Sequence, residues 1–259
     1  MEPLLKAEHL TVCYDGIETV KNVSFSLEKG EVLGIVGESG SGKSTLIRAI
    51  MGLLGESGQV TEGSIVYQGN DLTGMSQKEL RLIRGTQLGM IFQDSKAALC
   101  PVRKIGRQIQ EAMQSHQKIR SQEVKKQAVT AMEKLGLEDP ERIWNSYPFE
   151  LSGGMNQRVG ICMAIMLRPS VLLADEPTSA LDVTMQRQVI EELQLMKRDT
   201  EMSMFLVTHN IGVVRQLADK ILVLQDGQTK EYGECQKVLE EPRDPYTRQL
   251  IASTLTLQK

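Results

Sequence analysis

The sequence predicts a mixed α/β fold in which alternating strands and helices are interrupted by a helical block. Three observations support this prediction. Apolar, strand-like segments occur near both ends of the 259-residue chain, a glycine-rich loop joins one of them to a helix, and residues 96–167 have helical character. The length suits one large α/β domain, or one domain with an inserted subdomain.

The N-terminal part is predicted to be mainly β. The segments HLTVCY, VKNVSFSL and EVLGIVG are strand-like, and Glu28-Lys29-Gly30 forms a turn between the last two. A helix is expected from Ser44 to Leu54, ending near Gly55. Two further strands, GSIVYQG and LGMIFQ, precede the helical block.

The helical block shows its period best between Ser121 and Leu135. One face of that helix would carry Val124, Ala128, Ala131, Met132 and Leu135. Alternation then resumes: the expected elements are strands VLLAD and MFLVTH, helices over 184–197 and 211–217, a hairpin turning at Asp226-Gly227 and a short helix after Pro245. The block therefore interrupts the α/β pattern as an insertion.

Composition excludes several classes of protein. A net charge of −3 and 4% aromatic residues argue against nucleic acid as a partner. No apolar run reaches the roughly 18 residues of a membrane span, and the N-terminus lacks a signal-peptide core, so a membrane role would come through a partner.

The scattered cysteines are expected to be reduced thiols of a cytosolic protein: Cys13, Cys100, Cys162 and Cys235.

The segment GESGSGKS, from Gly37 to Ser44, fits the pattern of a phosphate-binding loop. Its glycines let backbone amides wrap phosphates, and the following helix adds positive charge at its N-terminus. Lys43 would reach the β- and γ-phosphates of a nucleotide, and Ser44 would hold Mg²⁺. A flexible Gly/Ser turn is the competing interpretation, but the strand before the loop and the helix after it favour the phosphate site.

A second motif, VLLADEP, places two carboxylates at the end of a hydrophobic strand. Asp175 could bind the Mg²⁺ of a neighbouring phosphate loop. Glu176 could then polarise the attacking water as a general base. An acidic cap on the strand is the alternative, and the phosphate loop makes it less favoured.

Three single residues are ambiguous on their own. Gln93 and His209 follow predicted strands at the edge where open α/β sheets bind ligands. Tyr14 ends an N-terminal strand and could stack on a nucleobase. Without further information, each of the three is read as an ordinary structural or surface residue.

The segment LSGGMNQR predicts another glycine-rich helix start. Ser152 is a plausible N-cap, and Gly153 and Gly154 would expose the first amides of the helix to an anion. No lysine accompanies them, so the segment would act on a phosphate already bound elsewhere. Close packing of the helix is the alternative explanation of the glycines.

In combination these motifs resemble the ATP-binding subunit of an ABC transporter, over nearly the whole chain. The order matches: GESGSGKST, the Gln93 loop, LSGGM, VLLADE, SALD (Ser179 to Asp182) and Thr208-His209. The resemblance implies a P-loop NTPase (ABC ATPase) with a RecA-like core and an N-terminal antiparallel β subdomain. Residues 1–259 would form one such domain, with a helical subdomain inserted at about 96–167 and a C-terminal extension at about 234–259.

The resemblance also implies roles for single residues. Glu176, His209 and Gln93 would be catalytic; Ser44, Gln93 and Asp175 would bind Mg²⁺; Asp182 would belong to the D-loop. Tyr14 would stack on adenine. ATP would be bound within the chain by this aromatic ring and by the phosphate loop, that is by Gly37, Ser39, Gly40, Gly42, Lys43, Ser44 and Thr45.

Members of this family dimerise head to tail, so Ser152, Gly153 and Gly154 would cover the ATP of a partner. The implied partners are a second homologous ATPase subunit, two transmembrane permease subunits and, indirectly, an extracytoplasmic substrate-binding protein. The implied location is peripheral, on the cytoplasmic face of a bacterial cell membrane.

Within the family, YPFELSGGM and PYTRQLIAS are similar to the peptide and nickel uptake group. Met155 matches the SGGM type of subunit, which suggests a heterodimer. The short tail favours nickel or a nickel chelate as cargo, with di- or oligopeptides as the alternative. Ser95, Cys100 and Asn210 depart from the group's usual proline, asparagine and aspartate.

Two hypotheses from other classes stay open at this point. The chain could be an ATP-gated binding module that barely hydrolyses ATP, although Glu176 and His209 argue against it. It could also be an ABC-type ATPase of DNA repair or translation, although it has neither a long coiled-coil insert nor a second such domain.

Overall fold

The computed structural model describes residues 2–256 and divides the chain into two units. The first unit combines the chain up to Arg84 with the chain from Ser203 onward, and the second unit is Gly85–Met202. Strands and helices occur in both, which confirms the predicted α/β class.

An antiparallel sheet of order β2-β1-β4-β5 forms one part of the first unit. Its strands are β1 (Leu5–Tyr14), β2 (Ile17–Leu27), β4 (Gly58–Tyr67) and β5 (Asn70–Asp71). A two-residue turn joins β1 to β2, with Asp15 at φ 49° and Gly16 at φ 80°. These angles suit a tight hairpin between twisted strands.

The other part of the first unit contains the strand order β10-β9-β3-β8. The strands are β3 (Val32–Val36), β8 (Ser203–Val207), β9 (Lys220–Gln225) and β10 (Gln228–Glu234). β3 runs parallel to β8 and β9, and every residue of β3 and β8 is buried, as expected for parallel strands covered on both faces. The predicted hairpin turn at Asp226-Gly227 is confirmed, with φ values of 51° and 80°.

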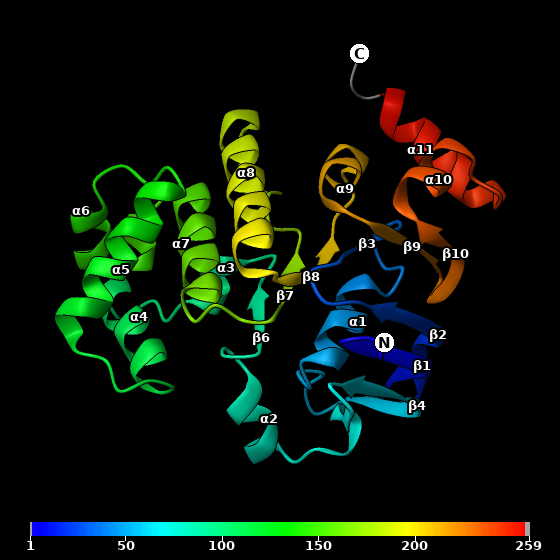
Figure 1. Cartoon of the computed structure of the whole chain (residues 1–259), viewed down its shortest axis with the longest axis horizontal. Helices are drawn as coiled ribbons and strands as arrows, with labels where there is room; N and C mark the ends of the chain where they lie inside the picture. The colour runs from blue at the N-terminus through cyan, green and yellow to red at the C-terminus, as the bar shows by residue number, and fades with distance from the viewer. Residues whose placement is uncertain (1, 257–259) are drawn as a thin grey trace. The chain divides into compact units, whose positions relative to one another are not determined.

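Helices of the first unit are α1 (Lys43–Ile50), α2 (Gln77–Ile83), α9 (Ile211–Leu217), α10 (Cys235–Glu240) and α11 (Pro245–Thr256), with a short 3₁₀ turn at Leu72–Gly74. Figure 1 shows α10 and α11 beside the β9–β10 hairpin. Gly34 lets α9 approach β3 closely, because a Cβ there would lie 2.8 Å from a methyl group of Val214.

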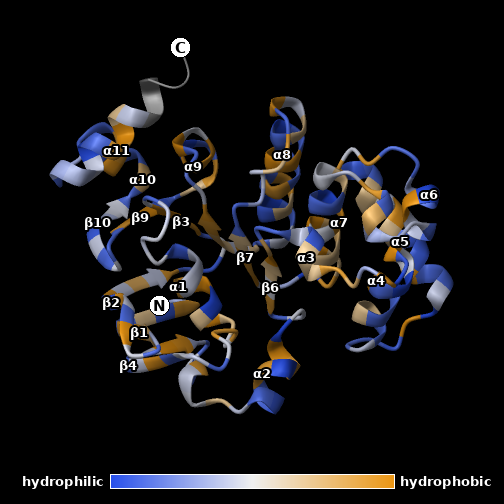
Figure 2. Cartoon of the chain, turned by 180° about the vertical axis from the view of Figure 1, so that it is seen from behind, coloured by the Kyte–Doolittle hydropathy of each residue, from blue (hydrophilic) through white to orange (hydrophobic). Residues whose placement is uncertain are grey.

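The second unit contains a parallel pair of strands, β6 (Leu88–Ile91) and β7 (Val171–Asp175). Between them lie α3 (Ser95–Ala98), α4 (Ile105–Gln114), α5 (Ser121–Lys134), α6 (Pro140–Asn145), a 3₁₀ turn (Pro148–Glu150) and α7 (Gly153–Met166), and α8 (Val183–Thr200) follows β7. Figure 2 shows the orange and blue faces of α8, whose buried residues are Val189, Ile190 and Leu193. On α5, Val124, Ala128 and Met132 are buried as the period predicts.

Helix α1 ends four residues earlier than the sequence predicts, at Ile50 rather than Leu54. Gly52 adopts φ 60°, a conformation typical of the residue after a helix. Arg84 donates hydrogen bonds to the carbonyls of Met51 (2.7 Å) and Gly52 (2.8 Å). A guanidinium at a helix C-terminus offsets the negative end of the helix dipole, so this contact stabilises the early end.

No helix among residues 2–256 is both long enough and apolar enough to cross a membrane. The cysteines are free thiols, and Cys13, Cys162 and Cys235 are buried. Burial raises the pKa of Cys162 to about 12 and that of Cys235 to about 11. These thiols therefore stay protonated and inert at neutral pH.

Candidate functional site

The candidate residues fall in both units of the chain. Tyr14, the phosphate loop and His209 belong to the first unit. Gln93, Asp175, Glu176, the Ser152–Gly154 segment and Asp182 belong to the second. The geometry of each set is described within its own unit.

The phosphate loop runs from the end of β3 to the start of α1 and needs glycine at two points. Gly37 has φ 154°, and a Cβ there would lie 2.1 Å from the Leu224 carbonyl oxygen. Gly42 has φ 99°, and its Cβ would lie 2.7 Å from the Thr19 carbonyl oxygen. The loop is thus wedged against the backbones of β9 and β2, where only glycine fits.

Lys43 is the first residue of α1, and its side chain folds back over the loop. The residue is only 9% exposed, and its Nζ donates to the carbonyls of Gly37 (2.8 Å) and Glu38 (2.7 Å). Ser44 and Thr45 follow in the first turn of the helix and are half-buried, whereas Ser39 and Gly40 are exposed. An ammonium group and a helix N-terminus converge on this exposed loop, which suits a polyphosphate.

The β9–β10 hairpin supports the loop from the side. The amide of Gly227 donates to the carbonyl of Ser41 (3.2 Å), and the carbonyl of Gly227 accepts from the amide of Lys21 (2.8 Å). The Asp226-Gly227 turn therefore joins the phosphate loop to β2. The sequence predicted the turn but not this contact.

Tyr14 and His209 share the unit of the phosphate loop. Tyr14 ends β1, is half-buried and lies against Gly58, where a Cβ would be 2.6 Å from the tyrosine ring. His209 is exposed and follows β8, the strand parallel to β3. His209 and the phosphate loop thus lie at the same carboxyl edge of two paired strands, where α/β sheets bind ligands.

Asn210 begins the helix after the candidate histidine. Its side-chain oxygen accepts from the amides of Gly212 (2.9 Å) and Val213 (3.4 Å), which caps α9. Asparagine and aspartate are equally good N-caps. The departure from the usual aspartate therefore preserves the start of α9 and the place of His209.

Asp175 and Glu176 follow β7 as predicted. Asp175 is 1% exposed and Glu176 is 9% exposed. Glu176 adopts φ 48°, a left-handed conformation that is uncommon for a residue with a side chain. Its carbonyl accepts from the Ser179 amide (3.3 Å) and the Ser179 hydroxyl (3.1 Å), which hold this conformation.

Gln157 is a functional candidate that the sequence reasoning missed. It lies on α7, is 2% exposed, and its Nε2 donates to the carbonyls of Phe92 (3.4 Å) and Pro177 (3.2 Å). Phe92 precedes the exposed Gln93, and Pro177 follows Glu176. One buried amide therefore joins α7, which begins within LSGGM, to the backbones of two candidate loops. The sequence alone shows only a glutamine two residues after LSGGM, because the burial and the two contacts depend on the folded chain.

The LSGG segment begins α7 as expected. Ser152 is the N-cap, and its hydroxyl accepts from the Met155 amide (3.2 Å). A Cβ at Gly154 would meet Leu181 at 3.3 Å, whereas a Cβ at Gly153 would have no described atom within 4 Å. Ser152 and Gly153 are exposed. Packing against the described residues therefore gives no reason for glycine at position 153.

Asp182 is exposed and caps α8, accepting from the Met185 amide (3.0 Å). Gln186 donates to the carbonyls of Thr178 and Leu181, both at 3.1 Å, and so fixes the turn before the helix. The segment between β7 and α8 is thus held by its own side chains. Asp182 also acts on Arg158 of α7: burial lowers the pKa of this arginine, while the charges of Asp182 and Glu138 oppose the shift.

The candidate Mg²⁺ ligands are all hard oxygen donors: the hydroxyl of Ser44, the carboxylate of Asp175 and the amide oxygen of Gln93. Mg²⁺ prefers oxygen ligands and is commonly held by one or two carboxylates together with phosphates. The described residues contain no cluster of three or more His, Cys, Asp or Glu side chains that could hold a metal ion alone. Each of these oxygen donors is thus of the kind that Mg²⁺ prefers.

Comparisons with known proteins identify the family of the chain. The model of the ABC transporter family matches residues 20–179. The chain is 43% identical to the oligopeptide transport ATP-binding protein OppD of Bacillus subtilis (strain 168), over 98% of this chain and 73% of that protein. It is 42% identical to the dipeptide transport ATP-binding protein DppD of Escherichia coli (strain K12), over 96% of this chain and 77% of that protein.

A solved structure is similar as well. The dimeric structure of a post-hydrolysis state of the ATP-binding cassette MJ0796, bound to ADP and Pi, matches with a TM-score of 0.80 and 29% identity. The match covers 89% of this chain and 98% of that one. The family model, the relatives and the fold point to one conclusion: the chain belongs to the ABC transporter family and is an ATPase of that family.

Proposed function

We propose that this chain is the ATP-hydrolysing subunit of a bacterial importer of di- or oligopeptides, bound peripherally at the cytoplasmic face of the membrane. The observation that carries the proposal is the identity of 42–43% with oligopeptide and dipeptide transport proteins over nearly the whole chain. The expectation of nickel as cargo rested on where the chain ends and has no support among these relatives. We therefore propose di- or oligopeptides, which the sequence offered as the alternative, as the cargo in place of nickel.

Roles for the site residues follow from their chemistry. Lys43 and the amides of the phosphate loop would bind the ATP phosphates, and Tyr14 would contact the adenine. Glu176 would accept a proton from the attacking water, and His209 would contact the γ-phosphate. Mg²⁺, held by Ser44, Gln93 and Asp175, would neutralise charge on the phosphates when bound.

The LSGG segment would act on the ATP of a partner subunit. Gly153 supports this role, because neither its backbone angle nor packing against the described residues requires a glycine there. Close approach of a ligand from outside the chain would explain it. The dimer of MJ0796, bound to ADP and Pi, is consistent with a site completed by a second subunit.

A heterodimer with a second homologous ATPase subunit follows from Met155, as the SGGM type implies. Two permease subunits would bind this dimer, and a substrate-binding protein would deliver peptide to them. We place the permease contact on the second unit, at the Gln93 loop, which the family resemblance couples to the membrane subunit. Exposed large apolar side chains of this unit include Phe92 (38%), Val102 (78%) and Phe149 (64%).

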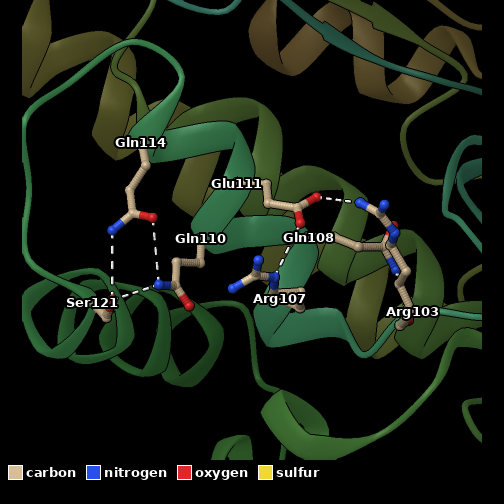
Figure 3. Close-up of polar contacts among 7 residues, drawn as sticks. All are labelled: Arg103, Arg107, Gln108, Gln110, Glu111, Gln114 and Ser121. Atoms are coloured by element: carbon tan, nitrogen blue, oxygen red, sulfur yellow. Dashed lines mark hydrogen bonds and ion pairs between the residues drawn. The ribbon is translucent and has the colours of Figure 1, made fainter.

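The loop that carries Val102 is fixed by polar contacts on α4 (Figure 3). Gln108 accepts from the amide of Cys100 (2.8 Å) and donates to the carbonyls of Cys100 (3.0 Å) and Arg103 (2.9 Å). Glu111 pairs with both Arg103 and Arg107. A loop held this firmly can present Val102 to a partner at little entropic cost.

We further propose that residues 1–259 act as one ABC ATPase domain. Residues 96–167 would be its inserted helical subdomain, and residues 234–259 would be its C-terminal extension. The helices α3 to α7 and the pair α10 and α11 support these two boundaries.

Reconstitution with the permease subunits, the second ATPase and the binding protein tests the cargo. We expect a dipeptide or short oligopeptide to increase ATP turnover, and nickel or a nickel chelate to have no effect. Stimulation by nickel alone would overturn the proposal.

The partner-site role of Ser152 is tested by Ser152→Arg. We expect this variant to bind ATP normally as an isolated subunit, but to impair ATP turnover in the assembled pair. Loss of ATP binding by the isolated subunit would show instead that the LSGG segment serves the site of its own chain.

A further inference from the structure

The C-terminal helix α11 reaches the phosphate loop through one tyrosine. The amide of Glu38, the second residue of the loop, donates to the Tyr246 hydroxyl at 3.0 Å. The two residues are 208 positions apart in the chain and lie in the same unit. Tyr246 belongs to the segment PYTRQLIAS, but no pattern in the sequence assigns it a role at the phosphate loop.

The aromatic ring of Tyr246 packs against a buried apolar cluster. Its members come from four regions: the end of β3, helix α9, strand β9 and helices α10 and α11, and they are Val36, Ile211, Val214, Ile221, Val223, Cys235, Val238, Leu239 and Ile251. Val36 directly precedes the phosphate loop, and Ile211 follows His209 by two residues. Helix α11 therefore shares one apolar cluster with the strand that ends at the phosphate loop and with the helix that follows the candidate histidine.

The start of α11 is held in place by carboxylates. Asp244 accepts from the amides of Tyr246 (2.8 Å) and Thr247 (3.4 Å), which caps the first turn. Glu231 of β10 accepts from the amides of Arg243 (3.0 Å) and Asp244 (3.2 Å). The backbone that carries Tyr246 is thus tied to the β9–β10 hairpin, whose Asp226-Gly227 turn also contacts the phosphate loop.

The protonation state of Tyr246 suits this contact. Burial raises the pKa of its phenol, the charges of Glu38 and Asp226 raise it further, and the bond from the Glu38 amide opposes the shift. The neutral hydroxyl accepts the Glu38 amide without placing a negative charge beside the phosphate site.

We propose that Tyr246 is a positioning residue through which the C-terminal helix fixes the entry of the phosphate loop and so strengthens ATP binding. The hydroxyl holds the Glu38 amide, and the Glu38 carbonyl in turn accepts from Lys43. A loop held in its binding conformation loses less entropy when ATP binds. This inference rests on ATP use by the chain and not on the identity of the cargo.

Tyr246→Phe tests the proposal, because it keeps the ring and removes only the hydroxyl. For the full-length chain we expect the Kd for a fluorescent ATP analogue to rise about three- to tenfold, the effect of one lost hydrogen bond. In the assembled ATPase, KM for ATP should rise by a similar factor while kcat stays within about twofold.

Tyr232→Phe is the matched control. Its hydroxyl accepts from the Ser26 amide (3.2 Å) and donates to the Ser26 carbonyl (3.1 Å) in the same unit, without contacting the phosphate loop. We expect its ATP affinity to equal that of the wild type. An unchanged Kd in Tyr246→Phe, or an equal rise in both variants, would overturn the proposal.

Asp244→Ala and hydrogen exchange supply independent readouts. Removing the Asp244 cap should loosen the start of α11 and weaken ATP binding in the same direction as Tyr246→Phe. Amide exchange in the peptide that contains Glu38 should be faster in Tyr246→Phe and unchanged in Tyr232→Phe. Unchanged exchange at Glu38 would contradict the proposed contact, whatever cargo the transporter carries.

Discussion

Gln157→Leu is a sharp test of the link between the two loops of the second unit. The substitution keeps a side chain of similar size but removes the Nε2 that donates to the carbonyls of Phe92 and Pro177. Pro177 is buried, so its carbonyl would lose its partner away from water, whereas the Phe92 carbonyl would keep the bond that it accepts from the Ser95 hydroxyl (3.2 Å).

The energetic cost can be worked from these two positions. A buried carbonyl left unpaired costs about 1–3 kcal/mol, and the loss of one of two bonds at the Phe92 carbonyl adds about 0.5 kcal/mol. We therefore expect a loss of about 2 kcal/mol in the free energy of unfolding, or about 4–8 °C in Tm for a chain of this size. Differential scanning calorimetry and urea unfolding would measure it.

Turnover should fall more than nucleotide affinity. Pro177 follows Glu176, whose left-handed backbone is held by its neighbours, and small misplacements of a reacting group are costly. We expect kcat for ATP to fall about tenfold, which is about 1.4 kcal/mol of activation free energy, with KM changed less than about twofold.

Gln108→Leu is the control for this experiment. Gln108 also donates from a helix of the second unit to two carbonyls, those of Cys100 and Arg103, without contacting either candidate loop. It should lower Tm and leave unchanged the basal kcat of the ATPase pair measured without the permease subunits. Equal losses of kcat in both variants, or a full kcat in Gln157→Leu despite a lower Tm, would refute the positioning role.

Three further predictions concern the general base, two buried cysteines and one glycine of the phosphate loop. Glu176→Gln should bind ATP but release phosphate at least about 100-fold more slowly, because the general base is lost; unchanged phosphate release would contradict that role. Burial raises the pKa of Cys162 to about 12 and of Cys235 to about 11, so iodoacetamide at pH 8 should alkylate them only after unfolding, as followed by mass spectrometry. Gly37→Ala should lose ATP binding in a fluorescence titration, because its Cβ would collide with the Leu224 carbonyl.

Local patterns predicted much of the fold. Helix α9 has the predicted bounds, Ser152 caps α7, and the hairpin turns at Asp226-Gly227, because each depends on residues close in sequence. The end of α1 was wrong because it depends on Arg84, more than 30 residues away. Helix α2 was missed although its capping box, Ser76 with Glu79, was readable in the sequence.

The candidate site shows the same limit. Motifs predicted the phosphate loop and the two acids after β7, because their chemistry lies in consecutive residues. Gln157 and Tyr246 were not predicted, because what they contact becomes visible only when distant segments meet. The expectation of nickel as cargo came from the tail alone, whereas the similarity to oligopeptide and dipeptide transport proteins extends over nearly the whole chain.

The Asp226-Gly227 turn has a practical consequence for labelling the protein. The β4–β5 turn has nearly the same backbone angles, with Gln68 at φ 47° and Gly69 at φ 79°, and a Cβ at Gly69 would have no described atom within 4 Å. A peptide tag should be tolerated at Gln68-Gly69. The same tag at Asp226-Gly227 would break the bond to Ser41 and disable the ATPase, although both positions look like ordinary surface hairpins.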